Sequence, residues 1–273
     1  MERRFSISPL YVWKSFWQYR GLIGQLTRRD IEVRYRGSVM GLLWSLLNPV
    51  LMLAVYTFAF GFMLKSRWSE GASSQTDFAI ILFAGLIVHG WLAECFNRAP
   101  GLILGNVNYV KKVIFPLEIL PWVAMGSALF HTAISLIVLI VFFTVVHGFI
   151  PWTIVFLPLI FLPLMFLIMG ISWMLAAIGV YLRDVGQTIV IITMILMFMG
   201  PVFYPLDRLP AHYRWIFYLN PLTVIIEQTR AAAIWGHMPD WGQLAVYYVA
   251  SLCIAWTGLV VFQKLRKGFA DVI

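Results

Sequence analysis

Six long stretches of the chain are apolar and contain no Asp, Glu, Lys or Arg. They cover residues 38–64, 78–93, 119–146, 152–182, 187–206 and 241–263. A helix needs about 20 such residues to cross the ~30 Å hydrocarbon core of a bilayer. The pattern therefore predicts an all-α integral membrane protein with six transmembrane helices. The second helix is short unless it continues past Glu94. Glu94 and Arg98 are one helical turn apart, so on a continuous helix their charges would pair and the helix could extend.

Composition agrees with a chain that is largely in contact with lipid. Hydrophobic residues make up 61% and charged residues 12% of the sequence, against roughly 45–50% and about 25% in soluble domains. The two cysteines lie in or beside apolar runs, which predicts neither a disulfide framework nor a metal site. The net charge of +8 comes from basic side chains next to apolar runs, so we expect them to face the membrane surface and not nucleic acid.

The distribution of Lys and Arg predicts the orientation. Of the 20 Lys and Arg residues, 15 lie before the first apolar run, after the last, or in the second and fourth connections, and 5 lie in the remaining connections. Cytoplasmic segments carry the excess of basic residues. Both termini are therefore predicted to be cytoplasmic, in a multi-pass protein.

Residues 10–35 are too polar to span the membrane. Aromatic side chains come first and Arg28, Arg29, Arg34 and Arg36 follow, a pattern typical of a helix that lies in the membrane interface. The alternative is a basic flank that only anchors the first span. We accordingly divide the chain into a cytoplasmic amphipathic segment, 1–36, and a six-helix transmembrane domain, 37–273.

Motifs of catalysis and of nucleotide binding are absent from the sequence. It has no phosphate-binding P-loop, no H-E-x-x-H and no G-x-S-x-G. Glu94 and Glu118 lie at the ends of spans, whereas ion-coupled transporters usually place ionisable groups near the bilayer centre. Histidines within the spans are expected to bond neighbouring helices. We therefore predict a transport subunit, not an enzyme, that binds no cofactor and takes its energy from a partner.

The longest predicted cytoplasmic loop covers residues 97–117. Lys111 and Lys112 precede an apolar run that Pro116 ends, which predicts a short amphipathic helix. Such a helix has to bury its apolar face against a protein partner or against the lipid surface, and the loop's residues leave both open.

Several landmarks together resemble one family. Asn97-Arg98, Tyr109-Val110-Lys111-Lys112 and Phe115-Pro116 resemble the loop of permeases in type-2 ABC exporters. The same resemblance extends, in order, to residues 34–38, 41, 44 and 49, to 181–185, to 201–205 and to 220–221. The most similar branch exports O-antigen, capsular polysaccharide and teichoic acid.

The resemblance implies a homodimer in the bacterial inner membrane, with six spans per subunit, that pairs with two copies of a separate ATPase holding ATP and Mg. Loop 97–117 would dock into the ATPase, and segment 207–236 would form two short external re-entrant helices. The cargo would be a lipid-linked glycan, usually on undecaprenyl pyrophosphate. The residues implied in ATPase coupling are Asn106, Asn108, Tyr109, Lys111, Lys112 and Phe115.

Two further sets of residues are candidates for contact with such a cargo. Arginine forks suit phosphate oxygens, so the pyrophosphate head group is assigned to Arg28, Arg29, Arg34 and Arg36; the alternative is anchoring by positive charge alone. Aromatic faces can stack on sugar rings, and the candidates for that role are Tyr56, Phe60, Phe203 and Tyr204. For these the alternative is the aromatic belt common to membrane helices.

Other functions remain open at this point. The same fold could export a drug or a lipid, which the neighbouring genes would distinguish. A membrane-embedded enzyme that processes glycans would need carboxylates or histidines at one depth, and the spans offer none. A plain structural anchor would not need spans broken by proline.

Overall fold

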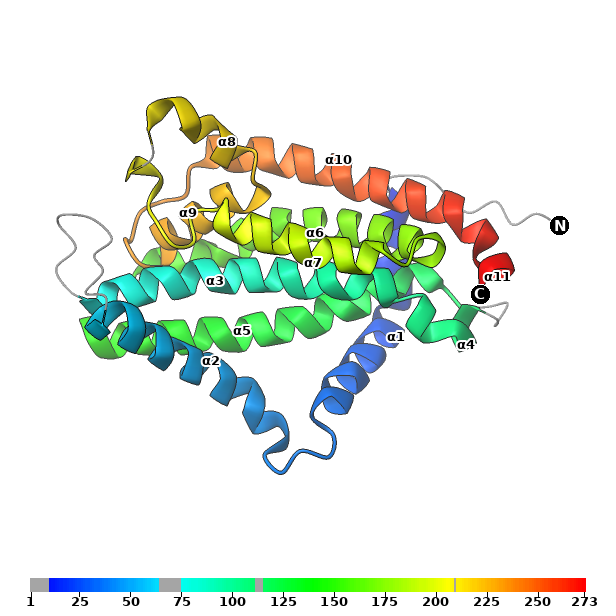
Figure 1. Cartoon of the computed structure of the whole chain (residues 1–273), viewed down its shortest axis with the longest axis horizontal. Coiled ribbons are helices and arrows are strands. Elements are labelled where there is room, and N and C mark those ends of the chain that lie inside the picture. The colour runs from blue at the N-terminus through cyan, green and yellow to red at the C-terminus, as the bar shows by residue number, and fades with distance from the viewer. Residues whose placement is uncertain (1–9, 64–74, 111–114, 209) are drawn as a thin grey trace.

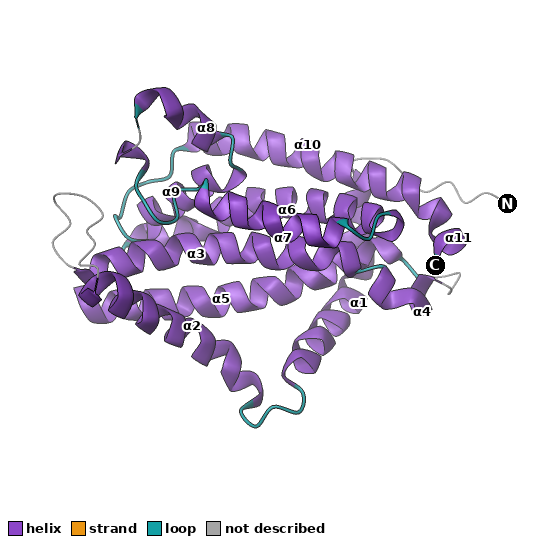
Figure 2. Cartoon of the chain, in the orientation of Figure 1, coloured by secondary structure: helices purple, strands orange, loops and turns teal. Residues whose placement is uncertain are grey.

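Helices account for all regular secondary structure in the residues that the computed structural model describes, 10–63, 75–110, 115–208 and 210–273 (Figures 1 and 2). The hydrocarbon core of a membrane offers no water to backbone N–H and C=O groups, and a helix pairs all of them within one segment. The predicted all-α class is confirmed.

Within the described residues, five helical segments are long and apolar enough to cross a membrane. Including short extensions, they cover Gly41–Phe60, Thr76–Gly101, Leu117–His147, Trp152–Tyr181 and Trp241–Val272. Their α-helical parts are α2 (Trp44–Tyr56), α3 (Gln75–Arg98), α5 (Leu120–His147), α6 (Leu157–Tyr181) and α10 (Trp241–Leu265). α2 continues as a π-helical stretch, and α3 runs past Glu94 as its spacing to Arg98 predicted.

The sixth apolar helix is shorter than the sequence indicated. α7 spans Val185–Phe198, 14 residues, which corresponds to about 21 Å against the ~30 Å of hydrocarbon. The predicted run extended to residue 206, but Gly200 and Pro201 follow the end of the helix and do not continue it. α7 is therefore an apolar helix of sub-membrane length.

The long helices alternate in direction along one axis (Figure 1). α3, α6 and α10 run toward the end of the bundle where the C-terminus lies, called the terminal end below, and α5 and α7 run away from it. The first helix, α1 (Leu10–Tyr35), and the short α4 (Val107–Val110) and α11 (Phe269–Val272) lie at this terminal end.

α3 is the centre of the bundle and α2 is its most peripheral span. In α3, 78% of the apolar window is buried within the chain, against 17% in α2. α10 packs closely on α6 because both carry glycine at the crossing. A Cβ at Gly258 would collide with the carbonyl oxygen of Gly170, so only glycine lets the two backbones approach this closely.

At the opposite end, two helices follow α7. These are α8 (Arg214–Tyr218) and α9 (Pro221–Ala233). The Asn220 side chain accepts a hydrogen bond from Leu222 N and begins α9. Arg230 is fully buried and donates to the carbonyl oxygens of Ile81, Pro201 and Val202, at 3.0, 2.5 and 3.0 Å. These bonds fix α9 to α3 and to the turn after α7.

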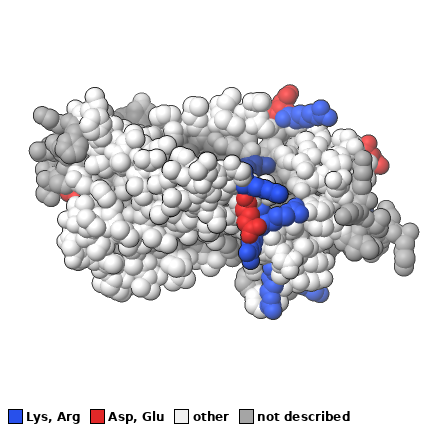
Figure 3. Space-filling view, turned by 90° about the horizontal axis from the view of Figure 1, so that it is seen from below, with Lys and Arg blue, Asp and Glu red and all other residues white. Residues whose placement is uncertain are grey.

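Charge is unevenly distributed on the lower face of the bundle. Seen from below, Lys, Arg, Asp and Glu side chains gather in the half nearer the termini, and almost all of the other half is uncharged (Figure 3). The segments that contain α2, α3 and α5, Gly41–Phe60, Thr76–Gly101 and Leu117–His147, are each long and apolar enough to cross hydrocarbon. The chain is therefore a multi-pass membrane protein with a charged belt toward one end.

Candidate functional site

A cavity of about 440 Å³ opens among α1, α2, α3 and α5, and the charged belt closes one side of it. α1 contributes Arg34 and Tyr35, and α5 contributes His131 and Ser135. α2 and α3 provide a mixed wall of apolar, amide and carboxylate groups, which consists mainly of Ser45, Asn48, Pro49, Met52, Tyr56, Phe83, His89 and Glu94. The cavity thus has a polar mouth and a largely apolar wall.

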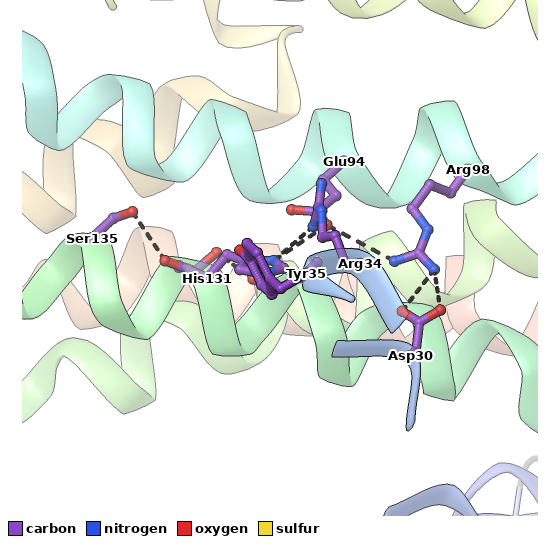
Figure 4. Close-up of polar contacts among 9 residues, drawn as sticks. Asp30, Arg34, Tyr35, Glu94, Arg98, His131 and Ser135 are labelled. Carbon is purple, nitrogen blue, oxygen red and sulfur yellow. Dashed lines mark hydrogen bonds and ion pairs between the residues drawn. The ribbon is translucent and has the colours of Figure 1, made fainter. Parts of the chain in front are cut away.

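Arg34 joins three helices at this mouth (Figure 4). Its Nη1 lies 2.5 Å from Oε1 of Glu94 on α3 and 2.9 Å from Nδ1 of His131 on α5. The next residue, Tyr35, places its hydroxyl 3.0 Å from Nε2 of the same imidazole. α1 is thereby bonded to α3 and α5 through two consecutive side chains.

The direction of these hydrogen bonds follows from their chemistry. A guanidinium only donates, so Nδ1 of His131 accepts from Arg34 and the imidazole carries its proton on Nε2. That N–H then donates to the Tyr35 oxygen. Burial raises the pKa of the Tyr35 hydroxyl above its ordinary value, so the phenol is neutral at physiological pH.

A second ion pair extends the cluster along the same two helices. Nη2 of Arg98, on α3, lies 2.8 Å from both carboxylate oxygens of Asp30, on α1. Asp30 and Arg34 are one helical turn apart, and so are Glu94 and Arg98. The acidic residue of each helix therefore pairs with the arginine of the other, Asp30 with Arg98 and Glu94 with Arg34 (Figure 4).

We call Asp30, Arg34, Glu94 and Arg98 the α1–α3 charge cluster. Two cations and two anions give it no net charge. An incoming phosphate would have to displace Glu94 from Arg34 before it could bind that guanidinium. In this conformation Arg34 and Glu94, which both line the cavity, are therefore engaged with each other.

The four arginines predicted to bind a head group do not converge on one site. Arg34 alone lines the cavity. Arg28 pairs with Glu32 on the exposed side of α1 at 2.8 Å, and Arg29 donates to the Tyr109 hydroxyl at 3.1 Å. Arg36 lies just beyond the end of α1, and its exposed side chain forms no hydrogen bond or ion pair with the other described residues. Their role in binding cargo stays a prediction.

Two of the six residues implied in ATPase coupling, Tyr109 and Phe115, connect the loop to the bundle. Tyr109 accepts the hydrogen bond from Arg29 of α1, and its ring stacks on Phe115 with centroids 4.2 Å apart. Asn106 donates to the Leu102 carbonyl at 2.9 Å, and Asn108 is exposed on α4. Lys111 and Lys112, with most of the predicted amphipathic helix, lie outside the described residues.

The same loop is joined to the C-terminal end of the chain. Arg266 donates to the Phe115 carbonyl at 3.0 Å and to the buried carboxylate of Glu118 at 2.5 Å. On the other side of the loop, Gly179 of α6 lies against the backbone of Pro100 so closely that a Cβ would collide with it. A movement of the loop would therefore be transmitted directly to α1, α6 and α10.

The four aromatic residues predicted to stack on sugars fall into two pairs. Tyr56 lines the cavity, and Phe60 stacks on Phe78 with centroids 5.5 Å apart. Phe203 stacks on Phe198 at 5.4 Å, and Tyr204 donates to the Phe198 carbonyl at 2.5 Å, at the far end of α7. The structure does not bring the two pairs onto one surface within the chain.

Sequence reasoning missed Asp30, Tyr35 and His131 as members of the site. His131 was expected only to bond a neighbouring helix, which it does, as does His89 through the Thr193 carbonyl at 2.9 Å. The sequence contained one signal for the cluster, because Asp30 and Arg34 are four residues apart and so are Glu94 and Arg98. Nothing in the sequence, however, indicated that these two segments face each other.

Comparison with known proteins gives a consistent picture over most of the chain. The sequence model of the ABC-2 type transporter family matches residues 21–234. The O-antigen export system permease protein RfbA of Klebsiella pneumoniae is 26% identical over 259 residues, which cover 92% of this chain and 95% of that protein. RfbA of Myxococcus xanthus is 26% identical over 262 residues, covering 95% and 98%. The polysialic acid transport protein KpsM of Escherichia coli is 23% identical over 244 residues, covering 88% and 92%.

Proposed function

Because the chain belongs to the ABC-2 type transporter family, we propose that it is the membrane permease of an ABC exporter that moves a lipid-linked polysaccharide out of the cell, driven by a separate ATPase subunit. The observation that carries this proposal is similarity over nearly the full length to permeases named for O-antigen export. The cargo is proposed to be a glycan on undecaprenyl pyrophosphate, and the membrane to be the bacterial inner membrane.

We propose that α7 forms a sixth crossing, so that both termini are cytoplasmic. Two observations support it. The first described helix, α1, and the last, α11, lie at the same end of the bundle, as an even number of crossings would require (Figure 1). The Lys and Arg residues are in excess at that end, as expected for the cytoplasmic side. α8 and α9 would then be the external re-entrant helices, with loop 97–117 on the cytoplasmic side.

The proposed assembly is a homodimer with two ATPase subunits, which bind the ATP and Mg. The support within this chain is the apolar surface of α2 and α7. Side chains of both helices are exposed in the single subunit, including Leu46, Val50 and Val55 of α2 and Ile191, Met194 and Ile195 of α7. A second copy packed on these faces would enclose a path between subunits, beside the cavity behind the α1–α3 charge cluster.

In the proposed mechanism, ATP hydrolysis by the partner moves loop 97–117. The Tyr109–Arg29 bond passes this motion to α1, and the Arg266 bonds to Phe115 and Glu118 pass it to α10. Movement of α1 separates Arg34 from Glu94 and opens the cavity mouth. The freed guanidinium then becomes available to a pyrophosphate, whose oxygens compete with the carboxylate.

Deletion of the gene tests the function. We expect lipid-linked polysaccharide to accumulate on the cytoplasmic face while the cell surface lacks it. The measurement is fractionation of the deletion strain, with the polymer detected before and after permeabilisation of the inner membrane. Normal surface polymer, in a strain without a second exporter, would refute the glycan cargo and leave only membership of the transporter family.

A further inference from the structure

A second cavity, of about 350 Å³, lies at the end of the bundle opposite the termini. It is enclosed by the segment between α7 and α8, by α9 and by the first turn of α10, all of which lie at that end in Figure 1. None of its lining residues belongs to the first cavity. Those used below are Tyr218, Glu227, Gln228, Trp235, His237 and Gln243.

A fixed carboxylate forms one part of the lining. Arg230 donates to Oε1 of Glu227 at 3.0 Å, and the same guanidinium is held by three backbone carbonyl groups. The orientation of Glu227 is therefore set by a buried, immobile cation. Within the described residues its second oxygen, Oε2, has no hydrogen-bond partner, so it can accept bonds from a ligand.

Two amides lie beside this carboxylate and are ordered by one another. Oε1 of Gln228 accepts from Asp240 N at 2.9 Å, and its Nε2 lies 3.5 Å from Oε1 of Gln243. The amide nitrogen of Gln243 has no partner in the part of the chain that the structure describes. The cavity therefore offers an amide donor near a carboxylate acceptor.

Aromatic rings complete the lining. Trp235 is 40% exposed and Tyr218 is 54% exposed, although both border the cavity. The imidazole of His237 is also exposed there. Large aromatic side chains at the mouth of a polar cavity provide flat apolar faces as well as polar groups.

We propose that this cavity binds a short segment of neutral sugar from the exported polysaccharide as it leaves the membrane domain. Adjacent hydroxyls of a sugar both donate and accept, so they match a carboxylate beside an amide donor. The C–H faces of the ring match Trp235 and Tyr218. The volume lies at the lower end of the range of about 300–1,000 Å³ for small-ligand sites, which suits one or two sugar units.

The charge of the cavity decides which sugars it accepts. Its two carboxylates, Glu227 and Asp207, are paired with Arg230 and Arg214. Both guanidinium groups are engaged by these pairs and by backbone carbonyl groups, so a phosphate or a carboxylated sugar would have to displace a carboxylate to bind them, whereas a neutral sugar would not. A metal ion is also a poor fit, because among the described residues no three His, Cys, Asp or Glu side chains are placed to hold one.

This proposal rests on the proposed export function, so the experiment separates the two. The probe is surface polysaccharide from the source strain, stripped of lipid and cut to oligosaccharides of a few repeats. Binding to the full-length permease in nanodiscs is measured by calorimetry. Trp235→Ala and Gln243→Ala are each expected to raise the Kd about tenfold, equivalent to about 1.4 kcal/mol.

The matched control is Trp215→Ala, which removes an exposed tryptophan of α8 outside the cavity lining and should leave the Kd unchanged. An oligomer of sialic acid, which is anionic, should not compete. Equal Kd values for all variants, or no binding by a permease that still restores surface polysaccharide in the deletion strain, would overturn the cavity as a sugar site while export stands. Normal surface polymer in the deletion strain would instead overturn the export function.

Discussion

Arg34 and Glu94 hold each other at the mouth of the first cavity, and each is incompletely shielded from water. Their side chains are 46% and 19% exposed, so the pair is intermediate between a surface and a buried ion pair. Removal of Arg34 leaves Glu94 with only the longer ion pair to Arg98, at 3.8 Å. We expect the pair to matter more for the position of α1 than for the stability of the bundle as a whole.

We predict that Arg34→Gln lowers the free energy of unfolding by about 1 kcal/mol, which corresponds to a melting temperature lower by ~2–4 °C. It should reduce export more strongly than this, because Arg34 also lines the cavity. Thermal unfolding in detergent and surface polysaccharide at matched protein level measure the two effects.

The double variant Arg34→Gln/Glu94→Gln is the control for charge. It should recover the melting temperature, since no unpaired charge remains, while export stays low if the guanidinium binds the head group. Full export by either variant would show that Arg34 does not contact cargo.

Arg230 has a different residue-scale role, because it is fully buried and donates to three backbone carbonyl groups in two separate segments of the chain. We predict that Arg230→Lys lowers stability by about 3–5 kcal/mol, since an ammonium cannot reproduce the planar fork that these bonds need. The amount of monodisperse protein in size-exclusion chromatography measures it. Arg36→Lys, at an exposed position, serves as control, and normal yield of Arg230→Lys would contradict the prediction.

At the residue scale, the sequence indicated which side chains belong to the site more reliably than which side chains pair with each other. It placed Arg34 near the membrane surface and allowed Glu94 to pair with Arg98, but that pair, at 3.8 Å, is the weaker one beside Glu94–Arg34. Partners depend on how helices cross, which spacing along one chain does not reveal.

At the scale of elements, the contact between α6 and α10 depends on two glycines. Gly258→Ala places a methyl group against the backbone of Gly170, so the helices have to separate. We predict a loss of about 1–3 kcal/mol, the usual effect of overpacking, measured as a lower melting temperature in detergent.

Gly186→Ala is the matched control for this change. Gly186 lies in the first turn of α7, where an added Cβ meets no atom within 4 Å. That variant should be neutral or slightly stabilising, because alanine favours the helix by roughly 0.5–1 kcal/mol over glycine. If both variants unfold at the same temperature, the α6–α10 crossing is not as close as described.

The elements themselves could largely be predicted from hydropathy. Five of six apolar runs became helices of spanning length, and residues 10–35 formed the expected helix. The end of α7 was predicted too late, because Phe203 and Tyr204 are as apolar as the helix before them, although Gly200 and Pro201 are a sequence signal that stops a helix. The packing order of the helices, with α3 central and α2 peripheral, was beyond prediction, since all the runs are similarly apolar.

At the scale of the whole molecule, the topology depends on whether α7 crosses the membrane. We predict that alkaline phosphatase is active when fused after Gly148 or Pro239, and inactive after Asp184 or at the C-terminus. Green fluorescent protein at the same positions should give the complementary pattern. An inactive fusion at Pro239 would mean that α7 does not cross and that the second cavity faces the cytoplasm.

The glycine crossing also has a consequence for how the chain is made. A ribosome completes α6 well before α10, so the groove at Gly170 stays open until the last long helix emerges. A polypeptide that stops before Trp241 contains every residue matched by the family sequence, 21–234, yet it leaves this groove facing lipid or another chain. Such truncated products should be recognised by membrane proteases rather than retained as partly working subunits, so the last helix made completes the fold.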